Sequence, residues 1–180
     1  GMNWITKVTP PGLKTMLAKK DTPDDLWVKC PLSGELVYKT DLEENWHVTP
    51  AGAHLRISPR TRLRLLFDDE RWEPLALPSV PHDPLKFKDD KPYPSRLKAA
   101  KAKIAARDKK ESENGGAPII QEDCMVAAYG KIGGVPTVVL VQDFAFMGGS
   151  LGMAAGEGFV AAAQMALARK AGFVVCTASG

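Results

Sequence analysis

The chain has 180 residues, of which 44% are hydrophobic, and this predicts one globular domain with room for a small appendage. No apolar run approaches the roughly 20 residues of a membrane span, and the start GMNWITKVTP lacks the charged-then-apolar pattern of a signal peptide. Three widely spaced cysteines do not make a disulfide framework, so we expect a cytoplasmic protein.

The net charge is only +3, but the positive charge is concentrated in the middle of the chain. Residues 86–111 contain ten Lys or Arg against four Asp or Glu, whereas residues 116–180 contain three against four. Either a solvated helix face or a site for phosphate groups would explain this basic stretch. Nucleic acid is less expected, because the only aromatics within it are Phe87 and Tyr93.

The first half of the chain predicts several short elements. Residues 1–25 predict a short helix and a turn-rich linker. Residues 26–57 have short apolar and aromatic runs separated by Pro, Gly and Asn, which predicts a small β module. Ser58 and Pro59 have the form of an N-cap and first helical position, and open a helix over RTRLRLLF. A Pro-broken connector, ERWEPLALPSVPHDP, then leads to a surface helix over residues 95–108.

The last third predicts a β-hairpin followed by a β-α-β crossover. IIQEDCMVAAYGKI and VPTVVLVQDFAF are strand-like runs separated by Gly133 and Gly134, and the second run is apolar enough to be buried on both faces. A helix is predicted from 153 to 171, with Gly172 as its left-handed C-terminal cap. FVVCTAS then predicts another buried strand, in which Cys176 belongs to the core.

The run FAFMGGSLG places two glycines, Gly148 and Gly149, between the second strand and the helix. Ligands collect at the carboxyl ends of strands in such crossovers, and bare backbone lets an anionic group approach N–H donors. A tight turn packed against a helix, with no ligand, explains the pair equally well. The run is neither a P-loop nor a Rossmann fingerprint. Asp143 just before it is a candidate general base, although a buried or capping carboxylate is the commoner case.

The segments DPLKFKDDKPYPSRLKAAK, DFAFMGGSLGMAAGEGF and FVVCTASG resemble the β subunits of acetyl-CoA carboxylase carboxyltransferase, and the resemblance covers nearly the whole chain. It implies an α/β, crotonase-like (ClpP/crotonase) spiral of β-β-α units, of which residues 58–180 form the N-terminal part. It also implies transfer of a carboxyl group from carboxybiotin, held on a biotin carboxyl carrier protein, to acetyl-CoA. The product is malonyl-CoA for fatty-acid biosynthesis, and a carboxyltransferase α subunit is the implied partner.

By the same resemblance, Gly148, Gly149 and Ser150 line the acyl-CoA pocket, and backbone N–H groups hold the enolate oxygen without a protein base. Gly180, the first glycine of a Ser-Gly-Gly-Ala-Arg motif, is an implied oxyanion donor. The sequence ends inside this motif. We therefore expect a truncated chain that is inactive by itself, with an exposed strand edge that a swapped or homo-oligomeric assembly would cover.

The resemblance implies a degenerate zinc ribbon in residues 26–57. Many family members carry four cysteines there, and the matching positions in this chain are Cys30, Ser33, Thr49 and Gly52. Because three of the four ligands are missing, we expect no zinc and no other bound cofactor.

Two histidines near the second pair, His47 and His54, have unsuited spacing for a tetrahedral set. Without a metal the module needs other contacts, and the sequence predicts that apolar side chains supply them: Leu32, Leu36, Val37, Tyr38 and Trp46.

Two other functions remain open at this point. The first keeps the fold and changes the substrate, as in carboxyltransferases of the propionyl-CoA type. The second is a non-catalytic module in which the ribbon-like segment and residues 86–110 contact nucleic acid. Salt-dependent DNA binding would distinguish the second, because phosphate contacts weaken steeply with salt.

Overall fold

The computed structural model describes residues 26–79, 93–113, 115 and 117–179. The chain divides into two compact units, with the boundary between Leu55 and Arg56. The predicted helix and linker of residues 1–25 lie outside the described residues, as do Gly180 and residues 83–92 of the segment DPLKFKDDKPYPSRLKAAK. In the part that is described, no helix is long and apolar enough to cross a membrane.

The first unit is built on a two-stranded antiparallel sheet. Strands β1 (Trp27–Lys29) and β2 (Leu36–Tyr38) pair with Val28 opposite Val37. Helix α2 (Lys39–Glu44) follows directly, and the sequence did not predict it. Its inward residue, Leu42, is only 1% exposed, so a short helix supplies the apolar anchor of a module that we had expected to be all β.

The apolar packing predicted for this unit is wrong for three of its five residues. Leu32, Leu36 and Trp46 are 69%, 65% and 45% exposed. Two strands of three residues each have too little surface to cover such side chains. The buried residues lie instead in α2 and in the turns on either side of it: Cys30, Leu42, Thr49 and Ala53.

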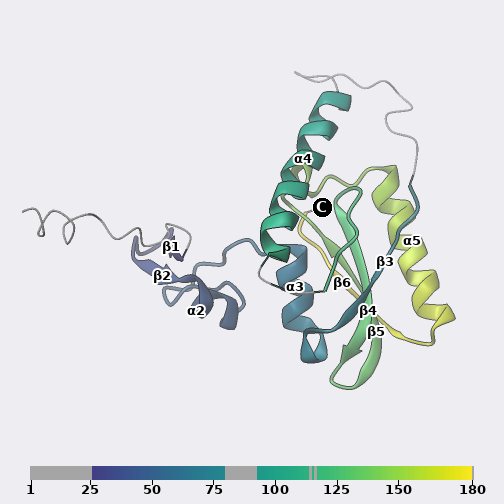
Figure 1. Ribbon diagram of the computed structural model, residues 1–180, viewed down its shortest axis with the longest axis horizontal. Coiled ribbons are helices and arrows are strands. Elements are labelled where there is room, and N and C mark those ends of the chain that lie inside the picture. Colours follow the sequence, from purple (N-terminus) through teal and green to yellow (C-terminus); the bar gives the residue numbers. More distant parts are fainter. Residues whose placement is uncertain (1–25, 80–92, 114, 116, 180) are drawn as a thin grey trace, which may run out of the picture. The chain divides into compact units, whose positions relative to one another are not determined.

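The second unit contains a mixed sheet in the order β3-β4-β5-β6, antiparallel except for the parallel pair β5-β6 (Figure 1). An α/β fold is therefore confirmed. The helices are α3 (Pro59–Leu66), α4 (Tyr93–Ser112) and α5 (Met153–Ala168), with single 3-10 turns η2 (Asp68–Glu70) and η3 (Met147–Gly149). The strands are β3 (Trp72–Leu75), β4 (Met125–Ile132), β5 (Val135–Gln142) and β6 (Gly172–Cys176).

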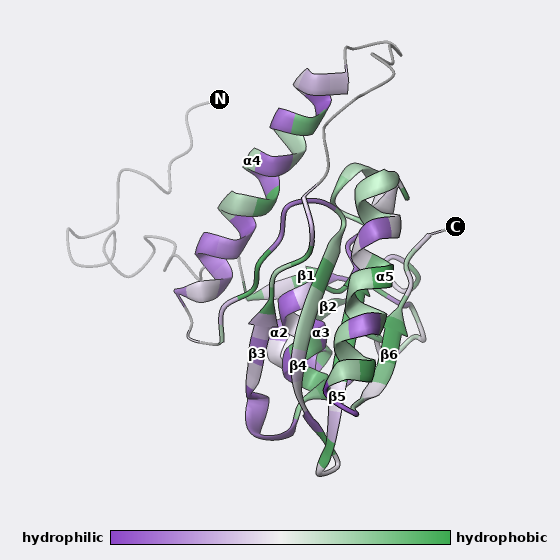
Figure 2. Cartoon of the chain, turned by 90° about the vertical axis from the view of Figure 1, so that its right-hand side faces the viewer, coloured by the Kyte–Doolittle hydropathy of each residue, from purple (hydrophilic) through white to green (hydrophobic). Residues whose placement is uncertain are grey.

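The two central strands are buried on both faces, as the apolar run of β5 predicted. Their side chains alternate: Val138 and Leu140 face a cluster with α4 and α5, whereas Val139 and Val141 face α3. The inner side of α5 carries alanine and glycine, which let the helix lie close to the sheet. Helix α4 shows alternating hydrophilic and hydrophobic bands, while β5 is mainly hydrophobic (Figure 2).

The predicted hairpin between β4 and β5 is confirmed, with Gly133 and Gly134 both at positive φ. Their N–H groups donate to the two carboxylate oxygens of Asp68, at 2.8 and 2.7 Å. These hydrogen bonds lower the pKa of Asp68 below its usual value. A side chain 65 residues away thus fastens the tight turn to the segment after α3.

Strand β3 was missed, because Pro74 lies inside it and the sequence indicated a Pro-broken connector. Proline is tolerated here because β3 is at the edge of the sheet, and within the described ranges it pairs with β4 alone. The predicted helix cap at Gly172 is also wrong. Helix α5 ends at Ala168, Lys170 takes the left-handed conformation with φ of 51°, and Gly172 begins β6.

Two further elements differ in detail from their prediction. Strand β4 begins at Met125 rather than near Ile119. At the start of the strand, the Asp123 carboxylate accepts a hydrogen bond from the Met125 N–H at 2.7 Å. Strand β6 is only partly buried, because it forms the other edge of the sheet, although Cys176 does pack against the α3 side of the core. The helix opened by Ser58 is confirmed, with its side chain accepting from the Thr61 N–H.

Helix α4 contains most of the basic stretch that the structure describes. Its buried residues Leu97 and Ile104 are seven positions apart and hold one face against the core. On that side Lys101 pairs with Glu122 at 3.4 Å, and Arg107 pairs with Asp143 at 2.8 Å. The other basic residues of α4 are exposed, which is compatible with a solvated face and does not test the phosphate alternative: Arg96, Lys98, Lys103, Lys109 and Lys110.

Candidate functional site

The candidate site begins where β5 ends. Asp143 turns the chain out of the sheet: its carboxylate accepts from the Ala145 N–H at 2.9 Å, and its carbonyl accepts from the Phe146 N–H at 3.2 Å. The chain then passes through η3 and enters α5, which returns it to the parallel strand β6. The glycine loop, residues 147–150, thus lies at the carboxyl end of β5, as the crossover predicted.

The two glycines of this loop differ in their surroundings. Gly148, with φ of 71°, is exposed, and a Cβ added to it would meet nothing within 4 Å. Gly149, with φ of 74°, is buried, and a Cβ there would lie 2.8 Å from the Ser179 Oγ and 3.2 Å from the Gln142 Nε2. The space that a side chain at Gly149 would need is therefore occupied by the side chains of Ser179 and Gln142. Gly148 is the glycine that leaves open space.

Backbone donors of the loop are partly used inside it. The Gly149 N–H donates to Phe146 O at 2.8 Å, and the Ser150 N–H donates to Met147 O at 3.3 Å. The Cys124 thiol in turn donates to Ser150 O at 3.3 Å, and burial raises the pKa of that thiol to about 12. Cys124 is thus an inert structural contact that holds the outgoing side of the loop.

Asp143 is a structural carboxylate rather than an available base. It is 3% exposed, and its oxygens accept from Arg107 Nη2 at 2.8 Å, Gln121 Nε2 at 2.8 Å and the Ala145 N–H. A base needs a lone pair that points toward the substrate, whereas these contacts already surround the carboxylate. Asp143 instead connects α4 to the start of the glycine loop.

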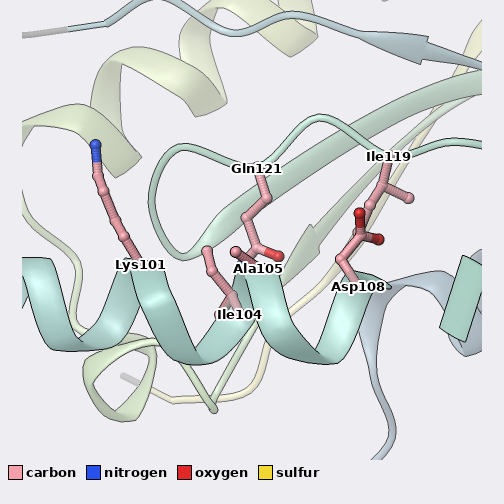
Figure 3. A pocket seen from close by; sticks show the side chains of 6 residues that line it. All are labelled: Lys101, Ile104, Ala105, Asp108, Ile119 and Gln121. Atoms are coloured by element: carbon pink, nitrogen blue, oxygen red, sulfur yellow. The ribbon is translucent and has the colours of Figure 1, made fainter. Parts of the chain in front are cut away.

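A cavity of about 280 Å³ lies beside this connection (Figure 3). Helix α4 and the segment before β4 line it with Lys101, Ile104, Ala105, Asp108, Ile119 and Gln121. The charged groups on its walls are already paired, Lys101 with Glu122 and Asp108 with Arg60. Such a cavity has little charge left for a phosphate group, so the glycine loop remains the better candidate.

Sequence reasoning missed Gln142, the last residue of β5. It is 5% exposed and hydrogen-bonds to both Gly149 and Ser179. A signal was present, since a single amide in a buried apolar strand must find partners for two donors and two acceptors.

In the first unit, the four positions that match the zinc ligands lie in two similar turns. The Cys30 Sγ and Thr49 Oγ1 atoms are 3.2 Å apart and hydrogen-bonded, and both residues are 2% exposed. The Ser33 N–H donates to the Cys30 sulfur at 3.5 Å, and the Ala53 N–H donates to the Thr49 hydroxyl at 3.0 Å. The side chain and N–H of Ser33, followed by the Thr49 hydroxyl, lower the pKa of the Cys30 thiol to about 7.

This set of groups does not fit zinc. Only Cys30 offers a thiolate, Gly52 has no side chain, and the Ser33 hydroxyl hydrogen-bonds to Glu35 at 3.2 Å. Within the described ranges, no group of three or more His, Cys, Asp or Glu is placed to hold a metal. The hydrogen bond between Cys30 and Thr49 instead joins the two turns to each other directly.

Comparison with known proteins identifies the second unit further. Residues 102–180 match the carboxyl transferase domain family. The acetyl-coenzyme A carboxylase carboxyl transferase subunit beta of Hyphomonas neptunium is 82% identical over 99% of this chain and 55% of its own length. The subunits so named in Hirschia baltica and Maricaulis maris are 56% and 52% identical, with 47% and 53% of their lengths covered.

The chain spans about half the length of the curated relatives that it matches. The match to the Hyphomonas neptunium subunit covers 179 residues and therefore extends over both units. The resemblance inferred from the three sequence segments is thereby confirmed: over nearly its whole length this chain is similar to acetyl-CoA carboxylase carboxyltransferase β subunits, of which it spans about half.

Proposed function

We propose that the chain acts in a carboxyltransferase β subunit of acetyl-CoA carboxylase, moving a carboxyl group from carboxybiotin to acetyl-CoA to form malonyl-CoA. The observation that carries this is the glycine loop at the carboxyl end of β5, in a chain 82% identical to a subunit of that name. A crotonase-like spiral, of which the β4-β5-α5 segment would be one β-β-α unit, belongs to the same proposal.

The proposed chemistry needs an enolate at the thioester, and backbone N–H groups that stabilise its oxygen. Gly148 is the residue of the loop that leaves space for the acyl group. Gly149 and Ser150 stabilise the shape of the loop through their N–H hydrogen bonds within it. Gly180 remains the proposed oxyanion donor and lies outside the described residues. Because Asp143 is occupied by three donors, the proton would leave the substrate without help from this carboxylate.

The partners in this proposal are a carboxyltransferase α subunit, which completes the site, and a biotin carboxyl carrier protein, which delivers carboxybiotin. A cytoplasmic location fits the free thiols of all three cysteines. A role for α4 in nucleic-acid binding is not favoured, because two of its basic residues are engaged in ion pairs within the chain.

The test is a hybrid subunit in which residues 1–180 replace the matching part of the Hyphomonas neptunium subunit. We expect the hybrid, given an α subunit and carboxybiotin, to carboxylate acetyl-CoA at a rate close to that of the parent. With acetyl-CoA and propionyl-CoA in competition, malonyl-CoA should be the main product. A folded hybrid without carboxyl transfer, beside an active parent, would contradict the proposal; a preference for propionyl-CoA would favour the related enzyme class.

We also propose that the first unit is free of zinc. Elemental analysis of the purified chain should find no stoichiometric zinc, whereas the triple variant Ser33→Cys, Thr49→Cys, Gly52→Cys should gain one zinc per chain. Structural zinc contributes about 10 kcal/mol or more, which exceeds the ~1–2 kcal/mol of strain from a cysteine at the φ of 82° found at Gly52. One zinc per unmodified chain would overturn this assignment.

A further inference from the structure

Gln142 makes a set of contacts that the proposed chemistry does not itself require. It is the last residue of β5, and its side chain is directed to the same face of the sheet as α5, following the alternation of Val138 and Leu140. At this point the strand is flanked by two irregular segments: the glycine loop and residues 177–179, which follow β6.

Both ends of the Gln142 amide are fully used. Its Oε1 accepts from the Ala178 N–H at 2.7 Å and the Ser179 N–H at 3.1 Å. Its Nε2 donates to Gly149 O at 2.5 Å and contacts the Ser179 Oγ at 3.1 Å. The Ser179 hydroxyl also donates to Gly149 O at 3.1 Å. The four hydrogen-bonding capacities of one amide therefore join two segments to a central strand.

The geometry of Gly149 depends on this arrangement. Its Cβ position is taken by the Ser179 Oγ and the Gln142 Nε2, so the loop can approach residues 177–179 only because position 149 has no side chain. Neither segment belongs to the sheet, so without the Gln142 amide no ladder hydrogen bonds would fix the position of either one. Because Gln142 is only 5% exposed, its hydrogen bonds hold these loops more firmly than fully exposed bonds would.

We propose that Gln142 is a positioning residue, whose amide sets the distance between the glycine loop and the segment that leads to Gly180. This inference rests on the proposed function, because it takes these two segments as the walls of the acyl-CoA site. Gln142 acts through Gly149 and Ser179 and needs no contact with substrate. Its contribution is the placement of backbone groups, for which an error of about 1 Å can cost about 100-fold in rate.

The variant Gln142→Met keeps the length of the side chain and removes all four hydrogen bonds. Thr137→Val is the matched control, because Thr137 is a 4% exposed polar residue at the other end of the same strand, with its hydroxyl donating to Val135 O at 2.9 Å. In the hybrid subunit, we expect Gln142→Met to lower kcat about 10- to 100-fold. Thr137→Val should leave kcat within about twofold.

A pH profile separates positioning from general stability. Gln142→Glu keeps the two bonds accepted from Ala178 and Ser179, but as a carboxylate it cannot donate to Gly149 O. When protonated it can donate again, and burial favours the protonated form. At a temperature where every variant is folded, the kcat of Gln142→Glu relative to the unmodified hybrid should rise at least threefold between pH 8 and pH 6.

The inference is overturned if Gln142→Met and Thr137→Val lose kcat equally, or if Gln142→Met stays within about twofold of the unmodified hybrid. Should the unmodified hybrid itself be inactive, the proposed function fails, and hydrogen exchange on the 180-residue chain then tests Gln142 separately. We expect the Ala178 and Ser179 amides to exchange at least tenfold faster in Gln142→Met but not in Thr137→Val. Unchanged protection of both amides would refute the positioning role.

Discussion

Replacing Arg107 with methionine is expected to lower the free energy of unfolding by about 3 kcal/mol. The substitution leaves the Asp143 carboxylate, 2% exposed in its side chain, without its cation. Removing one partner of a buried ion pair costs about 3–5 kcal/mol, and the low end applies because Arg107 is itself 21% exposed. Urea denaturation of the chain measures the loss directly.

Two variants serve as controls for this prediction. Lys101→Met removes a cation from the same helix, but its partner Glu122 is 69% exposed, so the cost should stay below about 1 kcal/mol. Adding Asp143→Asn to Arg107→Met removes the unpaired charge while keeping an acceptor for the Ala145 N–H, and should recover part of the loss. Equal costs for Arg107→Met and Lys101→Met would show that the Asp143 pair is no more than a surface contact.

The two glycines of the loop should respond differently to the same substitution. Alanine at Gly148 or Gly149 meets similar backbone strain, about 1–2 kcal/mol, because φ is 71° and 74°. Gly149→Ala also pushes against Ser179 and Gln142, which adds about 1–3 kcal/mol of overpacking, whereas Gly148→Ala enters open space. In thermal or chemical denaturation, the free energy of unfolding of Gly149→Ala should therefore be lower than that of Gly148→Ala by this overpacking cost.

Acyl-CoA binding by the hybrid subunit should follow a different order from stability. Gly148→Ala adds a methyl group on the open side of the loop, so its Kd for acetyl-CoA should rise more than its stability falls. Gly149→Ala should lose both together. Equal stability of the two variants would mean that the contacts of Gly149 do not constrain the loop. Equal Kd values would mean that the open space beside Gly148 has no special role in binding acetyl-CoA.

Local patterns predicted the centre of the fold well. The paired glycines at 133 and 134, the Ser58 cap and the continuous apolar run of β5 each depend on a few neighbouring residues, and each is found where it was expected. The order strand, glycine loop, helix, strand then predicted the position of the candidate site. In a parallel crossover the connection leaves the carboxyl end of the first strand, which here is β5.

Features that depend on distant residues could not be predicted in this way. Strand β3 contains Pro74 and exists because β4 offers it an edge. The exposure of Leu36 and Trp46 follows from how little surface the first unit can cover. At the site, Gly149 looked like its neighbour Gly148 because the difference between them arises from Ser179, 30 residues away.

The amide of Gln142 also affects how this region can be redesigned. Since Gly149, Ser179 and Gln142 share one set of hydrogen bonds, their substitutions should not be additive, and a change tolerated at one position will depend on the residues at the other two. A mutant library intended to alter the acyl group accepted by the proposed site would therefore vary these three positions together. Gly148, which has open space, can be varied independently of them.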